Sequence, residues 1–494
     1  MNQRIRHLTV VMLVLFGSLF VMLSNWQVRE QHSLSVDGRN NRQELRSFDS
    51  PRGQVITADG VVVADTVKVY TKLHPNDRFT WQREYPTGDL FAGIVGYYTY
   101  GFGSTQIERQ FDSVLAGRTA LQQVDSVPQG SVHLTLRADL QKTAKSALRG
   151  REGSAVVLDI RTGAVLAMYS NPTFDPNIVA GHDTGAANSY LQGLLDNPGK
   201  PLLANAYQER YMPGSTFKIL TTTIGLQSGV LTEASTFPDS RSWTPPNTKK
   251  PIRNYGKKVC GGDLAEVFRR SCNIPFAQTA VTIGPDHFVN GVNSFGFDEK
   301  LPFDLPGAAW STFGGTAKDF DNSLALLAIH GFGQGQVQVV PLHMAMIAAT
   351  VANGGVMMRP YAIESTQTSG GTIISQTKPA PWKQPMDAAT ASTLNRLMVG
   401  VVQSGTASCC LQLANGVQAA AKTGTAQLNA EGQKQRSHAW ITAFAPAEAP
   451  RYAVAVMLKG VNDVISAGTG GHLAGPVAKV LLDKALSLPQ APTP

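Results

Sequence analysis

The stretch Tyr211-Met-Pro-Gly-Ser215-Thr-Phe-Lys218-Ile-Leu220 holds a serine and a lysine three residues apart, directly after Pro-Gly and before an apolar run. This pattern predicts the first turn of a buried helix, where side chains at that spacing share one face. A serine hydroxyl becomes a nucleophile when a base accepts its proton, and a desolvated lysine beside another cation can be neutral enough to do so. The helix N-terminus also offers partial positive charge to a developing oxyanion. The stretch therefore predicts a serine nucleophile with a lysine base.

The Ser-x-x-Lys spacing is common, and the chain repeats it at Ser375-Gln-Thr-Lys378. This second copy lies in a polar stretch beside Pro379, without a helix to align the two side chains. We interpret Ser375 as non-catalytic. The motif at Ser215 accordingly needs support from elsewhere in the chain.

Two downstream strings supply that support. Ser271-Cys272-Asn273 begins 56 residues after the first serine, and Lys422-Thr423-Gly424-Thr425, on a predicted strand, contains the only Lys-Thr-Gly of the chain. A helix cap is the simpler interpretation of either polar residue of the first string taken alone. The three strings in this order, however, are the motifs of β-lactamases and penicillin-binding proteins.

Length and composition set the frame for these motifs. The chain has 494 residues, 43% of them hydrophobic and 16% charged, so at least two folded units are expected and a disordered, collagenous or coiled-coil protein is excluded. The formal net charge of +8 is compatible with a negatively charged partner, such as nucleic acid, anionic lipid or an anionic polymer. No nucleic-acid motif occurs. Five cations cluster in one turn-rich segment, where a solvated loop is the plainer interpretation: Lys249, Lys250, Arg253, Lys257 and Lys258.

Residues 8–28 carry no charge and are mostly apolar, which is long enough to cross a bilayer core of ~30 Å as a helix. Arg4 and Arg6 precede this run, which favours a cytoplasmic tail at residues 1–7 and an extracytoplasmic body. A cleaved signal peptide is the alternative, but Ser24-Asn25-Trp26 lacks the small-x-small pattern of a cleavage site. We therefore expect a single-pass membrane anchor.

The remaining chain divides into a small β-rich unit at residues 29–138 and a larger unit at 139–487, followed by a flexible tail at 488–494. Asp59-Gly60 predicts a hairpin turn in the first unit. The second begins and ends with β runs bordered by helices, at 154–160, 164–170, 419–427, 439–445, 452–458 and a helix at 476–486. We expect an α+β fold, in which an antiparallel sheet from both ends is covered by the terminal helices and faces an inserted helical region across a cleft.

Other segments are less informative. Residues 341–353 predict a helix with proline at its start, and residues 363–387 a loop or weak hairpin. His438 and Trp440 face the same side of a predicted strand, where packing is the preferred interpretation over catalysis. The cysteines have no zinc-ligand spacing. Cys409 and Cys410, being adjacent, are poorly placed to bond each other, which favours pairing one of them with Cys260 or Cys272 or leaving thiols free; the sequence does not choose among the three complete connectivities.

With its three motifs, the sequence resembles the class B penicillin-binding proteins, the monofunctional transpeptidases of bacterial cell-wall synthesis, and in particular a short type of that family. The resemblance covers nearly the whole chain and includes the blocks Pro51 to Ile56, Gly153 to Asn177, Gly333-Gln-Gly335, Ala352 to Gly355 and His438 to Pro446. Glu108 lies in another block, which we interpret as structural. Leu136-Arg137 departs from the pattern, since relatives often have an acidic residue there. The resemblance implies a serine β-lactamase-like transpeptidase domain behind a dimerisation-like pedestal.

The resemblance also implies a role for each motif residue. Ser215 would attack the carbonyl between the last two D-alanines of a peptidoglycan stem peptide, with Lys218 as general base. Ser271 would relay a proton to the leaving amine, and Asn273 would orient Lys218 and the substrate. Lys422, Thr423, Gly424 and Thr425 would bind the substrate and its terminal carboxylate. The backbone N–H groups of Ser215 and Thr425 would form the oxyanion hole.

The implied substrates are stem peptides ending in D-Ala-D-Ala, with β-lactams as covalent inhibitors and no cofactor, metal or nucleic acid. A lipid II glycosyltransferase and divisome proteins are the implied partners, in a role linked to cell division. Two alternatives stay open. One is a membrane-anchored D,D-carboxypeptidase or β-lactamase, in which water replaces the acceptor amine, and the other is a non-catalytic β-lactam sensor or divisome scaffold.

Overall fold

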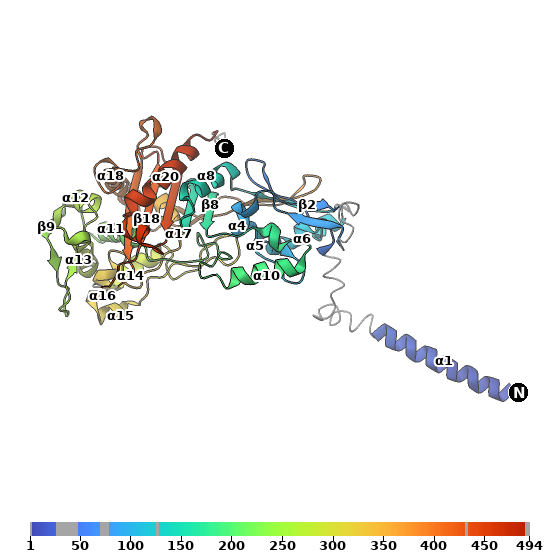
Figure 1. The fold of residues 1–494 in the computed structure, drawn as a ribbon. Coiled ribbons are helices and arrows are strands. Elements are labelled where there is room, and N and C mark those ends of the chain that lie inside the picture. Colours follow the sequence, from blue (N-terminus) through green and yellow to red (C-terminus); the bar gives the residue numbers. More distant parts are fainter. Residues whose placement is uncertain (1, 26–47, 70–78, 125–127, 430–432, 490–494) are drawn as a thin grey trace.

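The computed structural model describes residues 2–25, 48–69, 79–124, 128–429 and 433–489 (Figure 1). The predicted α+β fold is confirmed: a β-rich region precedes a large unit built around a five-stranded sheet. The N-terminal helix α1 (Asn2–Ser24) is long and apolar enough to cross a membrane. The last residues of the expected anchor, 26–28, and most of the expected tail, 490–494, lie outside the described residues.

The central sheet is antiparallel throughout and has the order β17-β18-β19-β7-β8. Its strands come from both ends of the large unit, as predicted: β7 (Gly153–Asp159), β8 (Val165–Asn171), β17 (Ala420–Gln427), β18 (Ser437–Ala445) and β19 (Tyr452–Leu458). All nine residues of β18 are buried because helices cover both faces of the sheet. Strand β17 forms one edge, so among the described residues one side of its backbone has no strand partner.

The terminal helices α8 (Ala138–Leu148) and α20 (Gly470–Leu486) pack against each other and on one face of the sheet, while α17 (Pro341–Ala352) packs on the other. Helix α20 starts six residues before the predicted Pro476. The Thr469 side chain accepts a hydrogen bond from the His472 backbone N–H and caps the helix there, so the proline falls inside it.

The helical region between the two halves of the sheet contacts β17 through residues 214–217 and 388–403, whereas its residues 176–195 lie beside the N-terminal region (Figure 1). Its helices are α9 (Pro176–Val179), α10 (Thr184–Leu195), α11 (Lys218–Gln227), α12 (Leu264–Arg269), α13 (Ile274–Ile283), α14 (Pro285–Ser294), α15 (Ala317–Asp321), α16 (Leu324–His330) and α18 (Ala388–Gln403), with α19 (Asp463–Ala467) after β19. Short strands accompany them: β9 (Thr236–Ser240), β10 (Ser242–Trp243), β11 (Ile252–Arg253), β12 (Cys260–Asp263), β13 (Met357–Met358) and β16 (Pro381–Lys383).

The N-terminal region is built on a second sheet, with the order β15-β14-β6-β1-β2-β3. Its strands are β1 (Val55–Ile56), β2 (Val62–Lys68), β3 (Trp81–Glu84), β6 (Gly130–Leu134), β14 (Ile363–Thr368) and β15 (Ile373–Gln376), with β4 (Tyr98–Thr99), β5 (Gly103–Ser104), α4 (Ala92–Val95), α5 (Gln106–Gln110), α6 (Asp112–Leu115) and α7 (Ala120–Val124) beside it. The predicted weak hairpin at 363–387 is therefore a pair of strands that completes this distant sheet.

A buried ion cluster holds the N-terminal region together. The fully buried Glu108 carboxylate accepts hydrogen bonds from Arg83 Nε at 2.7 Å and Arg52 Nε at 3.1 Å, and Arg52 also pairs with Asp112 at 2.7 Å. Burial alone would raise the pKa of Glu108, but the two guanidinium groups outweigh it and hold that pKa below its ordinary value. The structural role predicted for Glu108 follows directly from these contacts.

Replacing Glu108 by Gln should lower the free energy of unfolding of the detergent-solubilised protein by roughly 3–5 kcal/mol, because two buried cations lose their counter-charge. Lys145→Gln removes the exposed pair of Lys145 with Asp89 and should cost less than about 1 kcal/mol. Since the pKa of Glu108 is depressed, its contribution is present at neutral pH and is lost as the pH falls through that folded-state pKa. Urea unfolding at several pH values checks this; equal losses in both variants would contradict it.

Candidate active site

Ser215 lies in a 3-10 turn, Gly214–Phe217, that leads directly into α11, as predicted for a helix start. Gly214 has φ +56°, and a Cβ there would come within 2.9 Å of the Thr425 backbone. Its N–H donates to the Gly333 carbonyl at 2.9 Å. The turn is thus fixed between β17 and the Gly333-Gln-Gly335 block, and glycine is required at this close approach.

Lys218 follows Ser215 by one helical turn and is fully buried. Its amine donates to the Ser271 carbonyl at 2.8 Å and to Asn273 Oδ1 at 2.9 Å, and lies 3.4 Å from Ser271 Oγ. Burial, together with the charge of Lys422, lowers the pKa of Lys218 well below its ordinary value. The structure therefore holds this lysine in surroundings that favour a neutral amine.

Lys422, on β17, is equally buried, and its amine donates to Ser271 Oγ at 2.8 Å and to the Thr423 carbonyl at 3.1 Å. Burial lowers the pKa of Lys422 to about 7. The Ser271 hydroxyl is consequently in contact with two lysine amines. The three sequence motifs, which are far apart in the chain, meet at this one hydroxyl.

The loop that carries Ser271 is held in an unusual conformation. Ser271 has φ +59°, in the left-handed region that non-glycine residues seldom adopt. The neighbouring Cys272 is bonded to Cys260 of β12, and the Asn273 N–H donates to Asn254 Oδ1 at 2.8 Å. A covalent bond and a hydrogen bond thus fix the loop on either side of its motif.

Strand β17 presents the residues of the third motif. A Cβ at Gly424 would lie 2.7 Å from the Pro213 carbonyl oxygen, so glycine lets β17 approach the turn that carries Ser215. Thr423 Oγ1 is 2.5 Å from Thr406 Oγ1, and Thr425 Oγ1 accepts a weak hydrogen bond from the Gly470 N–H at 3.4 Å. Both threonine side chains are therefore positioned by neighbouring segments.

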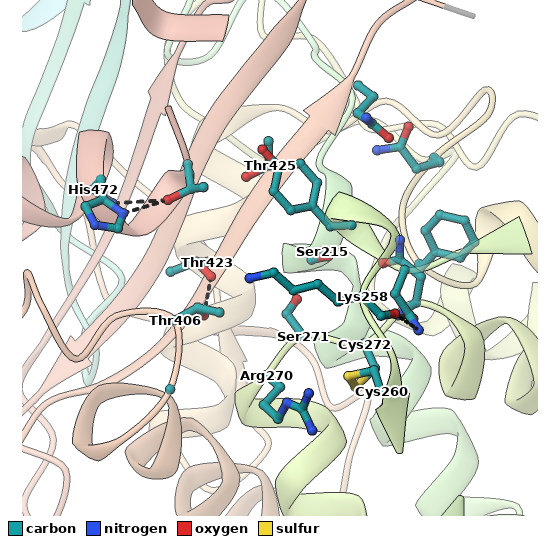
Figure 2. A pocket seen from close by; sticks show the side chains of 18 of the residues that line it. Ser215, Lys258, Cys260, Arg270, Ser271, Cys272, Thr406, Thr423, Thr425 and His472 are labelled. Atoms are coloured by element: carbon teal, nitrogen blue, oxygen red, sulfur yellow. Dashed lines mark hydrogen bonds between the residues drawn. A yellow bond between two sulfur atoms is a disulfide. The ribbon is translucent and has the colours of Figure 1, made fainter. Parts of the chain in front are cut away.

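A cavity of about 400 Å³ lies over these groups. Ser215, Ser271, Thr423 and Thr425 line it (Figure 2), as does Asn273. Lys218 and Lys422 are fully buried and do not line it. The structure thus brings all eight predicted site residues together around one cavity. Other residues that line it were not predicted as site residues: Lys258, Arg270, Thr406 and His472. Lys258 was noted for its charge alone, and the others lie in no recognised motif.

The residues set aside by sequence lie outside the reaction site. Trp440 is fully buried and its indole N–H donates to the Met212 carbonyl at 3.0 Å; His438 Nδ1 accepts from the Gly460 N–H, and burial lowers its pKa to about 4. Their predicted packing role is confirmed. Ser375 lies on β15 of the N-terminal sheet, 2.7 Å from Thr366 Oγ1, away from any lysine of the site.

The cysteine prediction is wrong. Cys260 pairs with Cys272, and the adjacent Cys409 and Cys410 are bonded to each other. The tight turn at residues 404–410 brings these two neighbouring side chains to one side, which the sequence spacing alone made unfavourable.

Two family profiles match the chain. That of the penicillin binding protein transpeptidase domain matches residues 153–483, and that of the penicillin binding protein A dimerisation domain matches residues 52–131. The chain therefore belongs to the penicillin-binding protein transpeptidase family, as its motifs predicted.

Within that family the chain is similar to the peptidoglycan D,D-transpeptidase PbpA of Mycolicibacterium smegmatis, at 35% identity over 98% of this chain and 99% of the relative. PbpA of Mycobacterium tuberculosis is 34% identical over the same shares. The ceftriaxone acyl-enzyme structure of penicillin-binding protein A from M. tuberculosis matches with a TM-score of 0.82 and 32% identity, over 90% of this chain and all of that one. The predicted resemblance to the short type, penicillin-binding protein A, is thereby confirmed.

Removing the covalent tether of the Ser271 loop should slow acylation. Cys260→Ala is expected to lower stability by roughly 3 kcal/mol in the chain-entropy description of a loop of this length, and to reduce the rate of acylation by a penicillin several-fold. The double variant Cys409→Ala/Cys410→Ala opens a ring between adjacent residues and should lose far less stability. Thermal unfolding and stopped-flow acylation measure both effects. An unchanged acylation rate in Cys260→Ala would show that the loop needs no tether.

Proposed function

We propose that the chain is a serine-type peptidoglycan D,D-transpeptidase that cross-links stem peptides through an acyl-enzyme and is inhibited covalently by β-lactams. The observation that carries this proposal is the buried amine of Lys218, one turn after Ser215. The Ser271 carbonyl and Asn273 Oδ1 accept the two hydrogens of a neutral amine, so the third contact, with Ser271 Oγ at 3.4 Å, falls to the lone pair, which can accept a proton.

In the first half of the reaction, Ser215 Oγ attacks the carbonyl between the two terminal D-alanines and Lys218 accepts the hydroxyl proton. The backbone N–H groups of Ser215 and Thr425 stabilise the oxyanion. Ser271 delivers a proton to the leaving D-alanine amine, which departs. Thr423, Gly424 and Thr425 bind the terminal carboxylate, with the charge of Lys422 behind them.

In the second half, an amine of a neighbouring stem attacks the acyl-enzyme. Asn273 keeps Lys218 oriented and contacts the backbone of the bound peptide. The amine nitrogen bonds to the carbonyl carbon, the bond to Ser215 Oγ breaks, and the proton that the amine gives up returns to the serine hydroxyl through Lys218 and Ser271. The product is a cross-linked peptide and the free enzyme.

We further propose the division of labour along the chain. Residues 8–28 anchor the protein in the cell membrane with residues 1–7 in the cytoplasm; residues 29–138 form the pedestal, residues 139–487 carry the reaction and residues 488–494 form a tail. A lipid II glycosyltransferase and divisome proteins are its proposed partners in cell-wall synthesis during division. The apolar helix α1 and the profile match at residues 52–131 support this arrangement.

Intact-mass spectrometry of the protein with a fluorescent penicillin tests the nucleophile. The unmutated chain should gain one stable adduct, which Ser215→Ala should lose completely and Ser375→Ala should retain, because the Ser375 hydroxyl bonds to Thr366 Oγ1 in the N-terminal sheet and not to the site lysines. Incubation with a stem pentapeptide and an acceptor should then release D-alanine and form a cross-linked dimer. Absence of an adduct in the unmutated protein would refute the serine mechanism, and hydrolysis alone would indicate a carboxypeptidase.

The pH dependence of acylation tests the base. Because the charge of Lys422 helps to lower the pKa of Lys218, Lys422→Met should raise that pKa, and the rising limb of the acylation rate should move to higher pH. The rate at neutral pH should fall at least about tenfold. Lys479→Met removes a partly buried lysine of α20 that pairs with Asp483 and does not line the cavity, so it should leave the profile unchanged. A limb that stays in place would mean that Lys218 is not the titrating base.

A further inference from the structure

The walls of the active-site cavity are unevenly charged. Among the described residues that line it there is no Asp or Glu, whereas two cations, Lys258 and Arg270, are present. The Arg270 guanidinium is already engaged: it donates to the Val259 carbonyl at 3.0 Å and lies 3.5 Å from a carboxylate oxygen of Glu266. Lys258 has no ion-pair partner in the part of the chain that the structure describes. Its charge is available to whatever enters the cavity.

Lys258 comes from the cation-rich segment that the predicted site did not include. Figure 2 shows its side chain extending into the cavity over Ser271, with the amine end directed toward Thr423. The Asn254 amide donates to the Lys258 carbonyl at 3.2 Å, and its oxygen accepts from the Asn273 N–H. One asparagine thus fixes the backbone of Lys258 relative to the motif residue Asn273.

The charge of Lys422, which the proposed function places behind the Lys-Thr-Gly motif, does not enter the cavity. Lys422 is fully buried, does not line the cavity, and donates to Ser271 Oγ and to the Thr423 carbonyl. The Thr423 hydroxyl is neutral and bonds to a carboxylate or to an amide alike. Lys258 is therefore the residue best placed to distinguish a charged from a neutral group beside Thr423.

In the transfer step, the acceptor brings a group of this kind to the position beside Thr423. The attacking amine must occupy the position that the D-alanine amine has vacated, because the acceptor amine attacks the carbonyl carbon on the face from which the D-alanine amine departed. The departing D-alanine has a carboxylate on the carbon next to its amine. An acceptor that also has a carboxylate on the carbon next to its amine would place that carboxylate where the carboxylate of the departed D-alanine was bound.

We infer that Lys258 binds the carboxylate of the acceptor and makes the transfer selective for amines that bear a carboxylate on the neighbouring carbon. This inference rests on the proposed function, and it names the acceptor class as an α-amino acid centre with a free carboxylate. The amine displaces Ser215 Oγ from the acyl group and its proton returns to the serine, so Lys258 neither gives nor takes a proton. Lys258 acts by a charge-assisted hydrogen bond alone.

The test uses the full-length protein in detergent and a thioester of an N-acyl-D-alanine as donor, so that acyl-enzyme formation and transfer are observed separately. D-alanine and D-alaninamide are compared as acceptors at equal concentrations of free amine, and the rate of amide formation is divided by that of hydrolysis. In the unmutated protein, D-alanine should be preferred by about tenfold. Lys258→Met should abolish the preference, whereas Lys258→Arg should keep most of it.

Lys250→Met is the matched control, since Lys250 is an exposed lysine of the same segment that does not line the cavity. It should keep the full preference. Equal rates for the two acceptors in the unmutated protein, or an undiminished preference in Lys258→Met, would overturn this inference while the acyl-enzyme, and with it the proposed function, persists. Failure of the unmutated protein to form any acyl-enzyme would overturn both. Acylation of each variant by the donor verifies that it is folded.

Discussion

The packing of the catalytic unit depends on one arrangement: the amines of Lys218 and Lys422 are both buried against the hydroxyl of Ser271. A buried ammonium without a counter-charge is costly, and for such a group a shifted pKa is the usual outcome. No carboxylate pairs with Lys218 or Lys422 among the described residues. Instead, carbonyl and hydroxyl oxygens accept their N–H groups, and burial lowers both pKa values. The fold generates a base by keeping water away from it, which requires α11, α13 and β17 to remain closely packed.

The close packing around Ser215 depends on glycine residues, which have no side chain. The turn carrying Ser215, the Gly333 loop and β17 approach one another through Gly214, Gly333 and Gly424, where a Cβ would meet backbone atoms at 2.9, 2.0 and 2.7 Å. Backbone at such distances leaves little freedom for the nucleophile to move. The donors proposed for the oxyanion hole belong to these same segments, so their separation is set by main-chain contacts rather than by rotatable side chains.

The sequence predicted the parts of this unit that follow local rules. The β runs of the central sheet, the helix at Pro341 and the helical start at Ser215 follow from hydrophobic periodicity and from proline and glycine signals. The motifs identified Lys218 and Lys422 because their chemistry depends on residue type and order. Lys258 and Thr406 were not predicted as site residues, since their importance arises only when distant segments fold against the cavity. The bond between Cys409 and Cys410 likewise depends on a turn that spacing does not reveal.

The strands β14 and β15 lie late in the chain, between α17 and α18, yet they complete the sheet of the N-terminal region. The Asp59 carboxylate, in the turn between β1 and β2 of that sheet, accepts from the N–H groups of Ala138 and Asp139 and so caps α8 of the central unit. The polypeptide thus passes from one region to the other and back again. Cutting it near residue 138 would remove β6 from beside β14 and would leave α8 without the Asp59 cap. A displacement of the N-terminal region would therefore pull on β14 and α8, which are parts of the catalytic half of the chain.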